Sequence, residues 1–401
     1  METIVEQKKD EIKESMLDFL GRQGALKMLT EALDEEVTAF LERRRYERAK
    51  QAAKGYRNGK RERQVTVMGA GLQLAVPRVS GVDYRSTILS PYQRRSEGVD
   101  ELFRRLYLEG LSSRDFEPAL KSLIGDGTTL SASSIQRLAQ KFQRDFEEFG
   151  RRDLTKSRYL YIWADGVYLK AGLESEKAAI LVLVGVNEQG RKELVSVMEG
   201  YRESSESWRE IWRGVKERGM EPPVLVIGDG IAGLWKAVAE VYPTAKGQRC
   251  WKHKMANIVD KVPRIKQEEV MERLRVAYQT DTREKAEQHL AVLAEDLDPR
   301  YPKAAQCVRQ DQEALLRYFD YPPAHWIHLK TTNPIESIFA GVRLRTYVLR
   351  RFQKAHAGAA FLYKIIQRLS VNWNPINKPE TVKRLWLEQL KNAGLAEVAA
   401  A

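Results

Sequence analysis

The chain has 401 residues, 43% of them hydrophobic and 30% charged, which excludes a disordered or fibrous protein. Its longest apolar run, nine residues at 178–186, is far shorter than the roughly 20 that a membrane helix needs, and the charged N-terminus shows no signal peptide. Two cysteines cannot form a disulfide framework, which fits the reducing cytoplasm. The net charge of +12 favours a polyanionic partner, chiefly nucleic acid.

Helical periodicity characterises residues 1–54, which we expect to form an N-terminal helical region. Residues 55–95 are expected to form a basic β-hairpin region, because glycine-rich turns separate the alternating segments "QVTV" and "LQLAV". Ten basic and two acidic residues lie between Arg43 and Arg63. This cluster suits DNA phosphates, although a solvated basic face would look the same. The cluster residues expected to bind DNA are Arg43, Arg44, Arg45, Arg57, Lys60, Arg61 and Arg63.

Residues 96–152 predict a unit of three short helices with serine N-caps. Such a unit can place one helix in a DNA groove, as helix-turn-helix proteins do. It is equally compatible with a dimerisation or packing bundle, and the residues alone do not decide between the two. The helices are expected at 98–110, 112–125 and 131–150, with caps at Ser112 or Ser113 and at Ser131.

From residue 153 the chain becomes rich in β-branched and aromatic segments. Three antiparallel strands, a helix, a buried strand, a helix and a fifth strand are expected, an order that matches the ribonuclease-H-like fold. Residues 153–250 would then form the first part of a catalytic domain. The expected strands are 159–171, 178–187, 191–201, 223–230 and 246–250, and the first helix is 204–220.

Residues 251–325 are helical and highly charged, and we expect an all-helical insertion there. Residues 326–401 would complete the catalytic domain and add a C-terminal helix. Asn333 is expected to be the N-cap of a helix, with Pro334 at its first position and Glu336 at its third, where Glu336 closes a capping box. The fold class predicted for the whole chain is multidomain α/β.

Two aspartates are notable within the expected sheet. Asp165 lies inside the first strand, where acidic residues are disfavoured; a bulge or turn at Asp165 and Gly166 would be an ordinary explanation. Asp229 ends the buried strand, at the edge where open α/β sheets bind ligands, unless it is a helix N-cap. Because these strands are neighbours in the expected fold, the two carboxylates can meet at one edge.

Two adjacent carboxylates repel each other, so we expect a cation to neutralise them. Mg²⁺ (or Mn²⁺) prefers oxygen ligands, and two such ions can activate a nucleophile and stabilise the leaving oxygen in phosphoryl transfer. Glu336 is the best third carboxylate, although a capping role alone would also explain it. Arg343 shares its helix face two turns on and suits a DNA phosphate.

Five motifs stand in order along the chain: "YRNGKRERQVTVMGAGLQLAVPRV", "WADGVYLK", "VLVIGDGIAGLWKA", "QRCWKH" and "TTNPIESIFAGVRLRT". With these motifs, roughly residues 20–350 resemble the Asp-Asp-Glu transposases of bacterial insertion sequences, the Mutator-like family. The resemblance implies that the catalytic triad of the family, which is also its set of metal ligands, falls on Asp165, Asp229 and Glu336.

The resemblance also covers Cys250 and His253, the Cys-x-x-His signature of the family. One Cys–His pair is weak evidence for zinc, because a closed site needs four ligands, so we expect a structural or DNA-contacting role. Trp251 is expected to pack in the core rather than to stack on a base. Many members of the family carry His, Arg and Asn at three further positions. In this chain these positions are Ile231, Ser337 and Phe339, so no role is transferred to them.

The resemblance implies a DNA transposase that binds the terminal inverted repeats of its element, hydrolyses DNA there and joins the freed 3′-hydroxyl to target DNA. Double-stranded DNA is the expected partner, in the bacterial cytoplasm and on the nucleoid, and synapsis of two ends implies a homodimer. Further DNA-binding candidates are Arg343, Arg345 and Arg350. A structure-specific nuclease on the same fold and a non-catalytic DNA-binding repressor remain as alternatives.

Overall fold

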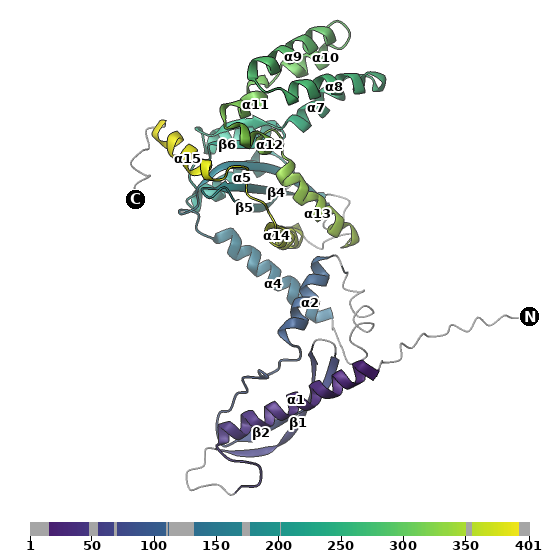
Figure 1. Ribbon diagram of the computed structural model, residues 1–401, viewed down its shortest axis with the longest axis vertical. Helices are drawn as coiled ribbons and strands as arrows, with labels where there is room; N and C mark the ends of the chain where they lie inside the picture. The colour runs from purple at the N-terminus through teal and green to yellow at the C-terminus, as the bar shows by residue number, and fades with distance from the viewer. Residues whose placement is uncertain are drawn as a thin grey trace, which may run out of the picture. The chain divides into compact units, whose positions relative to one another are not determined.

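The computed structural model describes residues 16–47, 55–67, 70–109, 111, 132–170, 177–200, 202–349 and 355–392. The chain divides into two compact units, Met1–Leu138 and Ala139–Ala401, and each is described by itself (Figure 1). The described residues form helices and two sheets, which confirms a mixed α/β protein, and none of these helices has the length and apolar character to cross a membrane. The expected helix at 112–125, the caps Ser112, Ser113 and Ser131, and Arg350 lie outside the described residues.

The first unit is built on a helix that covers a β-hairpin. Strands β1 (Tyr56–Val67) and β2 (Ala70–Ser80) pair antiparallel, which confirms the expected hairpin. Helix α1 (Met16–Leu41) packs on β2, and α2 (Glu97–Leu108) follows the hairpin in the chain. The buried core between α1 and the hairpin consists of Leu33, Val65, Leu72, Leu74 and Leu89.

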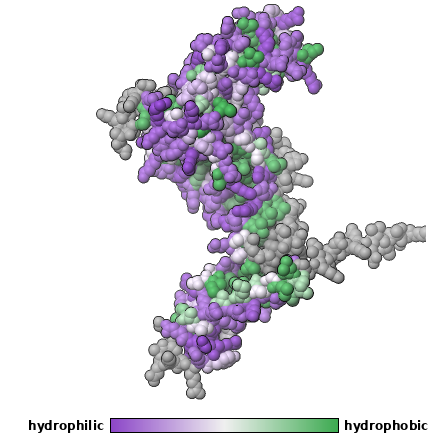
Figure 2. Space-filling model, viewed as in Figure 1, coloured by the Kyte–Doolittle hydropathy of each residue, from purple (hydrophilic) through white to green (hydrophobic). Residues whose placement is uncertain are grey.

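Apolar side chains stay exposed at the N-terminal end of α1, where Figure 2 shows hydrophobic surface. Met16 and Leu17 are 72% and 80% exposed, whereas Leu33, further along the helix, is buried. The stripe of α1 that packs on the hairpin therefore occupies only the later turns of the helix.

The second unit contains a five-stranded mixed sheet with the strand order β5-β4-β3-β6-β7. Strands β3, β4 and β5 pair antiparallel, and β3, β6 and β7 pair parallel. This confirms all five expected strands. Their bounds are β3 (Tyr159–Lys170), β4 (Lys177–Asn187), β5 (Lys192–Gly200), β6 (Leu225–Gly228) and β7 (Lys246–Arg249).

Helices surround this sheet and make up the rest of the second unit (Figure 1). Residues 251–325, which were expected to be all-helical, contain helices and no strand. The helices near the sheet are α4 (Ala132–Arg151), α5 (Ser205–Glu217), α6 (Ala232–Val241), α13 (Asn333–Leu349), α14 (Ala355–Ser370) and α15 (Glu380–Asn392). Between β7 and α13 lie α7 (Trp251–Val259), α8 (Arg264–Gln279), α9 (Arg283–Leu297), α10 (Pro302–Arg309), α11 (Gln312–Leu316), the 3₁₀ turns η1 (Arg317–Asp320) and η2 (Pro323–His325), and α12 (Trp326–Leu329).

Different helices cover the two faces of the sheet, because side chains alternate along each strand. Ile162 and Ala164 of β3 belong to the main apolar core, which α5 and α6 complete. Tyr161 and Trp163 point to the opposite face, where they form hydrogen bonds of 2.9 Å to a histidine of η2 and 3.0 Å to a carbonyl of α12. Asp165 continues this second series, so its carboxylate faces the segment that leads into α13.

Candidate active site

The parallel pairing of β3 and β6 places Asp165 and Asp229 side by side. Tyr161 pairs with Leu225 and Trp163 with Ile227, so partners are 64 residues apart in the chain. Asp165 and Asp229 have the same separation and lie two residues beyond the last pair, with Asp229 directly after the end of β6. Residues in register on neighbouring strands point to the same face, about 4.8 Å apart. The two carboxylates therefore share the sheet face that looks toward α12 and α13.

Asp165 is not part of a bulge, so that alternative is wrong. It pairs with Val182 of β4, and Gly166 pairs with the next residue, without a shift of register. The Asp165 carboxylate accepts a hydrogen bond from the Gly166 N–H (2.8 Å) and is only partly exposed. Because the strand is regular here, a bulge does not explain the acidic residue at this position.

Asp229 is not a helix N-cap either. Helix α6 begins at Ala232, with Ile231 as its N-cap residue, and the Asp229 carboxylate accepts the Ile231 N–H (3.0 Å) in a turn before the helix. Gly230 makes this turn with φ +89°, a conformation that suits glycine. The buried Arg249 at the end of β7 donates to the Asp229 carbonyl and fixes its backbone.

Glu203 is a further carboxylate at this edge, and sequence reasoning missed it. It precedes Ser204, the N-cap of α5, in the connection that follows β5. A Cβ on Gly166 would lie 2.5 Å from Glu203 Oε1, so the Glu203 carboxylate rests against the backbone of β3. No periodicity marks a loop glutamate of this kind, because only the return of the chain to β3 brings it there.

The carboxylates at this edge lack enough positive charge to balance them. Burial, together with the charges of Asp229 and Glu203, raises the pKa of Asp165 to about 7, although the Gly166 hydrogen bond opposes the shift. Burial and the charge of Asp229 likewise raise the pKa of Glu203 to about 7. The edge is therefore suited to a cation that oxygen ligands can hold.

Glu336 lies in the first turn of α13 and is held by two partners. Its Oε1 accepts a hydrogen bond from the Thr332 hydroxyl (2.8 Å), and its Oε2 pairs with Lys252. Burial alone would raise the pKa of Glu336, but Lys252 and Thr332 together hold it below its ordinary value. Helix α13 also contacts β3, which brings this carboxylate to the sheet.

The expected cap of this helix is wrong by one residue. Asn333 is the first residue of α13, and Thr332 precedes it, so Pro334 occupies the second position and Glu336 the fourth. The Glu336 carboxylate binds the Thr332 hydroxyl instead of closing a capping box with a backbone N–H. Thr332 takes the position before the helix because it is buried and its hydroxyl and N–H both contact the Cys250 sulfur (3.3 Å each).

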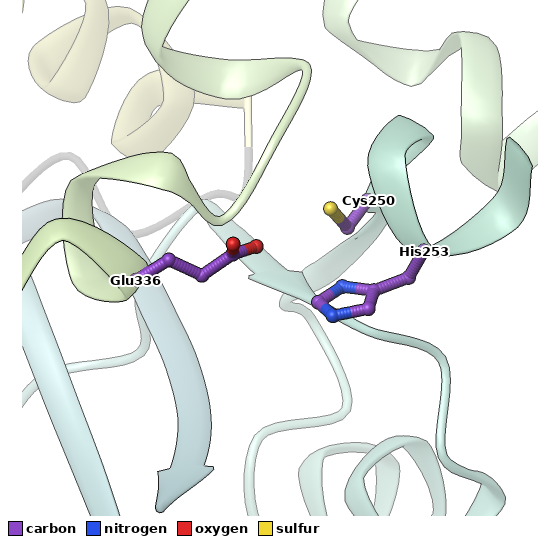
Figure 3. Close-up of side chains that lie close together, drawn as sticks. All are labelled: Cys250, His253 and Glu336. Carbon is purple, nitrogen blue, oxygen red and sulfur yellow. The ribbon is translucent and has the colours of Figure 1, made fainter. Parts of the chain in front are cut away.

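Cys250 and His253 lie next to Glu336 (Figure 3). Among the described residues, this is the one set of three potential metal-binding side chains whose ligand atoms all lie within 4.8 Å of one another. Cys250 precedes the first residue of α7, and its N–H donates to the Gly228 carbonyl (2.8 Å), which continues the pairing of β6 and β7. The Cys-x-x-His segment is thereby fixed to the sheet edge.

His253 links the acidic groups electrostatically. Its hydrogen bond with Cys250 raises its pKa to about 9, and the charges of Asp165 and Asp229 act in the same direction. Its positive charge also lowers the pKa of Glu336. The charges of Asp165, Asp229 and Glu336 therefore all interact with that of one imidazole. Trp251, in contrast, is 1% exposed and packs edge-on against Tyr278, which confirms that it is a core residue.

Several of the basic residues expected to bind DNA have partners inside the first unit. Asp34 of α1 pairs with Arg57 (3.4 Å) and Lys60 (2.8 Å). Arg43 and Arg63 donate to backbone carbonyls at 2.8 Å and 3.0 Å. These contacts hold α1 and the hairpin region together. The side chains left mainly in solvent are those of Arg44, Arg45 and Arg61.

On α13, Arg343 is exposed two turns beyond Glu336, and its Nε–H donates to the carbonyl four residues earlier in the helix (3.4 Å). Arg345 is half-buried and makes the same kind of bond (3.0 Å). Arg343 is thus an exposed residue on the helix that carries Glu336.

Comparison of the chain with known proteins identifies one family. A family model described as "Transposase, Mutator family" matches residues 1–375. A transposase for insertion sequence element IS6120 from Mycolicibacterium smegmatis is 45% identical over 284 residues, which cover 71% of this chain and 88% of that protein. A transposase for element IST2 from Acidithiobacillus ferrooxidans is 37% identical over 67% of this chain and 92% of that protein. A transposase for element ISRM5 from Rhizobium meliloti is 29% identical over 88% of each chain.

Gly230→Ala should destabilise the protein by roughly 2 kcal/mol or more, because a Cβ would overlap the Arg249 guanidinium at a backbone φ that only glycine tolerates well. Gly214→Ala in α5 is the matched control: a Cβ there meets nothing within 4 Å, so the helix should gain up to about 1 kcal/mol. Urea unfolding of both variants measures the difference. Equal stability of the two would contradict the role given to Gly230.

The contribution of Asp165 and Glu203 to the free energy of unfolding of the metal-free protein should fall as pH rises from 5 to 8. Asp165 and Glu203 have folded pKa values of about 7, raised above their ordinary values near 4, so their protonation stabilises the fold below pH 4 and this stability is lost as pH passes 7. His253, raised to about 9, acts in the same direction at higher pH.

Asp165→Asn should remove part of this dependence and raise stability at pH 8 by roughly 2 to 4 kcal/mol. Urea unfolding in the presence of a chelator, at several pH values, measures it. Asp298→Asn, which alters an exposed ion pair between the residue after α9 and Arg309 of α10, should leave the profile unchanged. An Asp165→Asn profile identical to that of the unmodified protein would refute the explanation.

Proposed function

Because the chain belongs to the Mutator family of transposases, we propose that it binds the ends of its mobile element, cleaves DNA strands there and joins the freed 3′-hydroxyl to target DNA. The observation that carries the chemical part is the register of β3 and β6, which puts Asp165 and Asp229 on one face beside a helix that bears Glu336. Paired carboxylates with a third on an adjoining helix suit metal-assisted phosphoryl transfer.

The catalytic unit is proposed to be ribonuclease-H-like. Three antiparallel strands, followed by two parallel strands on the other side of β3, support this assignment. In this proposal, residues 153–250 and 326–401 form the catalytic domain, and residues 251–325 are a helical insertion. The insertion leaves the sheet immediately after β7 and ends before α13, so both of its ends adjoin the proposed site.

The side chains at the sheet edge fit a hard cation. Asp165, Asp229 and Glu336 offer carboxylate oxygens, the donors that Mg²⁺ and Mn²⁺ prefer. Burial, together with the charges of Asp229 and Glu203, raises the pKa of Asp165, and a bound cation would favour the ionised carboxylate. These three residues would hold two ions, which when bound would activate the attacking hydroxyl and stabilise the leaving oxygen of the DNA phosphate.

The surrounding residues of the chain prepare the carboxylates for this task. Arg249 fixes the backbone of Asp229, and the Thr332 hydroxyl orients Glu336. Lys252 is exposed beside Glu336 and can release that carboxylate to bind a DNA phosphate instead. Arg343, in solvent two turns along the same helix, is placed to contact the DNA backbone further from the reacting phosphate.

The first unit is proposed to bind double-stranded DNA at the terminal inverted repeats, and residues 55–95 and 96–152 are the proposed DNA-binding regions. The exposed Arg44, Arg45 and Arg61 support this role through their charge. Two ends must be held together before joining, so the proposed active form is a homodimer, which acts on bacterial DNA in the cytoplasm.

Asp165→Asn, Asp229→Asn and Glu336→Gln should each abolish cleavage and joining while DNA binding persists. The assay combines purified protein, Mg²⁺ and a labelled duplex that carries the inverted repeats of the element. Asp296→Asn, in an exposed ion pair on α9, is the control and should stay active.

Normal joining by any of the three variants would refute the assignment of that residue. In particular, a glutamine can still accept the Thr332 hydroxyl, so an active Glu336→Gln variant would leave Glu336 with a structural role only. Cleavage by the unmodified protein without joining would identify a nuclease, and binding alone a repressor; either would overturn the proposed function.

Replacing Arg44, Arg45 and Arg61 with alanine should weaken DNA binding without loss of stability. If each contacts one phosphate, the slope of log K against log salt should fall by about 2 to 3. Arg57→Ala is the contrasting variant: it leaves Asp34 with fewer partners and should destabilise the first unit. Filter binding at several salt concentrations and thermal unfolding separate the two effects. An unchanged salt slope in the triple variant would exclude these residues from the interface.

A further inference from the structure

The cluster of Cys250, His253 and Glu336 is chemically different from the carboxylate pair on the sheet. It offers a sulfur, an imidazole nitrogen and a carboxylate oxygen, all within 4.8 Å of one another. Sulfur and imidazole ligands favour Zn²⁺ over Mg²⁺, which takes oxygen ligands almost exclusively. Sequence reasoning set zinc aside because one Cys–His pair is too few, and the fold supplies the third donor from α13.

The side chains converge with little rearrangement. Tetrahedral zinc, with bonds of about 2.0–2.3 Å, needs ligand atoms roughly 3.3–3.8 Å apart. Cys250 and His253 lie three residues apart at the start of one helix, on the side that faces Glu336 (Figure 3). The Glu336 side chain is 17% exposed and can rotate toward the pair. Three protein ligands with an open fourth position describe a zinc site that solvent or another ligand can complete.

Thr332 provides the outer contacts that such a site needs. Its N–H and its hydroxyl both lie 3.3 Å from the Cys250 sulfur, where they can stabilise a thiolate. The same hydroxyl is 2.8 Å from Glu336 Oε1 and 3.5 Å from His253 Nδ1. One buried residue therefore touches all three donors, and outer contacts of this kind fix ligand orientation at metal sites.

We propose that Cys250, His253 and Glu336 form a Zn²⁺ site that shares Glu336 with the hard-metal site proposed above, so that zinc withdraws this carboxylate from catalysis. The binding of zinc stands on the geometry of the three donors alone. The inhibitory consequence rests on the proposed function, because it requires Glu336 to be a catalytic ligand. Lys252, which pairs with the free carboxylate, would give way to the metal.

Cobalt(II) is the probe for the site, because it replaces zinc and shows an intense sulfur-to-metal absorption only when a thiolate binds it. Titration of the full-length protein with Co²⁺ should produce this band at one equivalent, and Zn²⁺ should remove it. Cys250→Ser should abolish the band. His253→Gln and Glu336→Gln should each weaken Co²⁺ binding at least tenfold.

Two control variants make the assignment specific. Cys307→Ser changes the second buried cysteine, which lies on α10, and should leave the band unchanged. Asp165→Asn should also retain it, because this carboxylate belongs to the other site. If Cys250→Ser does not fold, the Glu336→Gln variant tests the metal site instead, because the side chain of Glu336 is partly exposed and its replacement should not prevent folding. A missing band in the unmodified protein, or full-strength binding by Glu336→Gln, would overturn the site.

The inhibitory consequence is measured in the Mg²⁺-dependent cleavage assay. Near one equivalent of Zn²⁺ should inhibit the unmodified protein and Cys307→Ser, and a chelator should reverse this. The His253→Gln variant should need at least ten times more zinc than the unmodified protein for the same fractional inhibition, with each rate compared with that protein's own zinc-free rate. Equal sensitivity to zinc would refute the proposal that the two sites share a ligand. If the unmodified protein does not cleave DNA at all, the proposed function fails, whereas the cobalt spectrum still decides whether the metal site exists.

Discussion

The parallel pairing of β3 with β6 forces two carboxylates onto one face of the sheet, and the surrounding structure is arranged around their repulsion. Backbone pairing fixes the register as far as Trp163 and Ile227, and Asp165 and Asp229 each follow two residues later in the chain. Glu203 adds further negative charge at the same edge, and burial makes each charge more costly. A fold retains such an arrangement when a cation offsets it, and protonated His253 provides part of that charge in the metal-free protein.

The second determinant is the way in which the chain leaves and re-enters the sheet. Cys250 continues the pairing of β6 and β7 through its N–H and then starts α7, while the Trp251 N–H donates to the carbonyl of Lys330 (2.9 Å). These two bonds bring the start of the helical segment and its end together. Thr332 and Glu336 follow directly, so residues more than 80 positions apart meet at one sheet edge. The interior of the helical segment is tied to the same place, because Gln248 of β7 donates to the Leu315 carbonyl (2.9 Å) and Lys330 donates to the Tyr278 carbonyl (2.6 Å).

The arrangement of elements was largely predictable, because hydrophobic patterns report on burial. The runs that became β3, β4 and β6 are apolar along most of their length, and the helix expected at 204–220 is observed as α5 (Ser205–Glu217). Local geometry was predicted less well. The cap of α13 shifted from Asn333 to Thr332, because contacts with Cys250 favour Thr332, and no sequence motif reveals such contacts. Glu203 was missed for the same reason: its importance arises from a contact with β3 across the loop.

The sequence by itself determined which carboxylates are candidates for the proposed site: an aspartate inside an apolar strand, another at the end of a buried strand, and a glutamate at a helix start are visible in the linear pattern. It also determined the membership of the family, since its motifs stand in order along the chain. Only the tertiary structure decided how these groups are combined. Strand register aligned the two aspartates, and the return of the chain placed Glu336 beside Cys250 and His253. Such proximity depends on backbone pairing between distant segments, and the local pattern of side chains does not predict which distant segments pair.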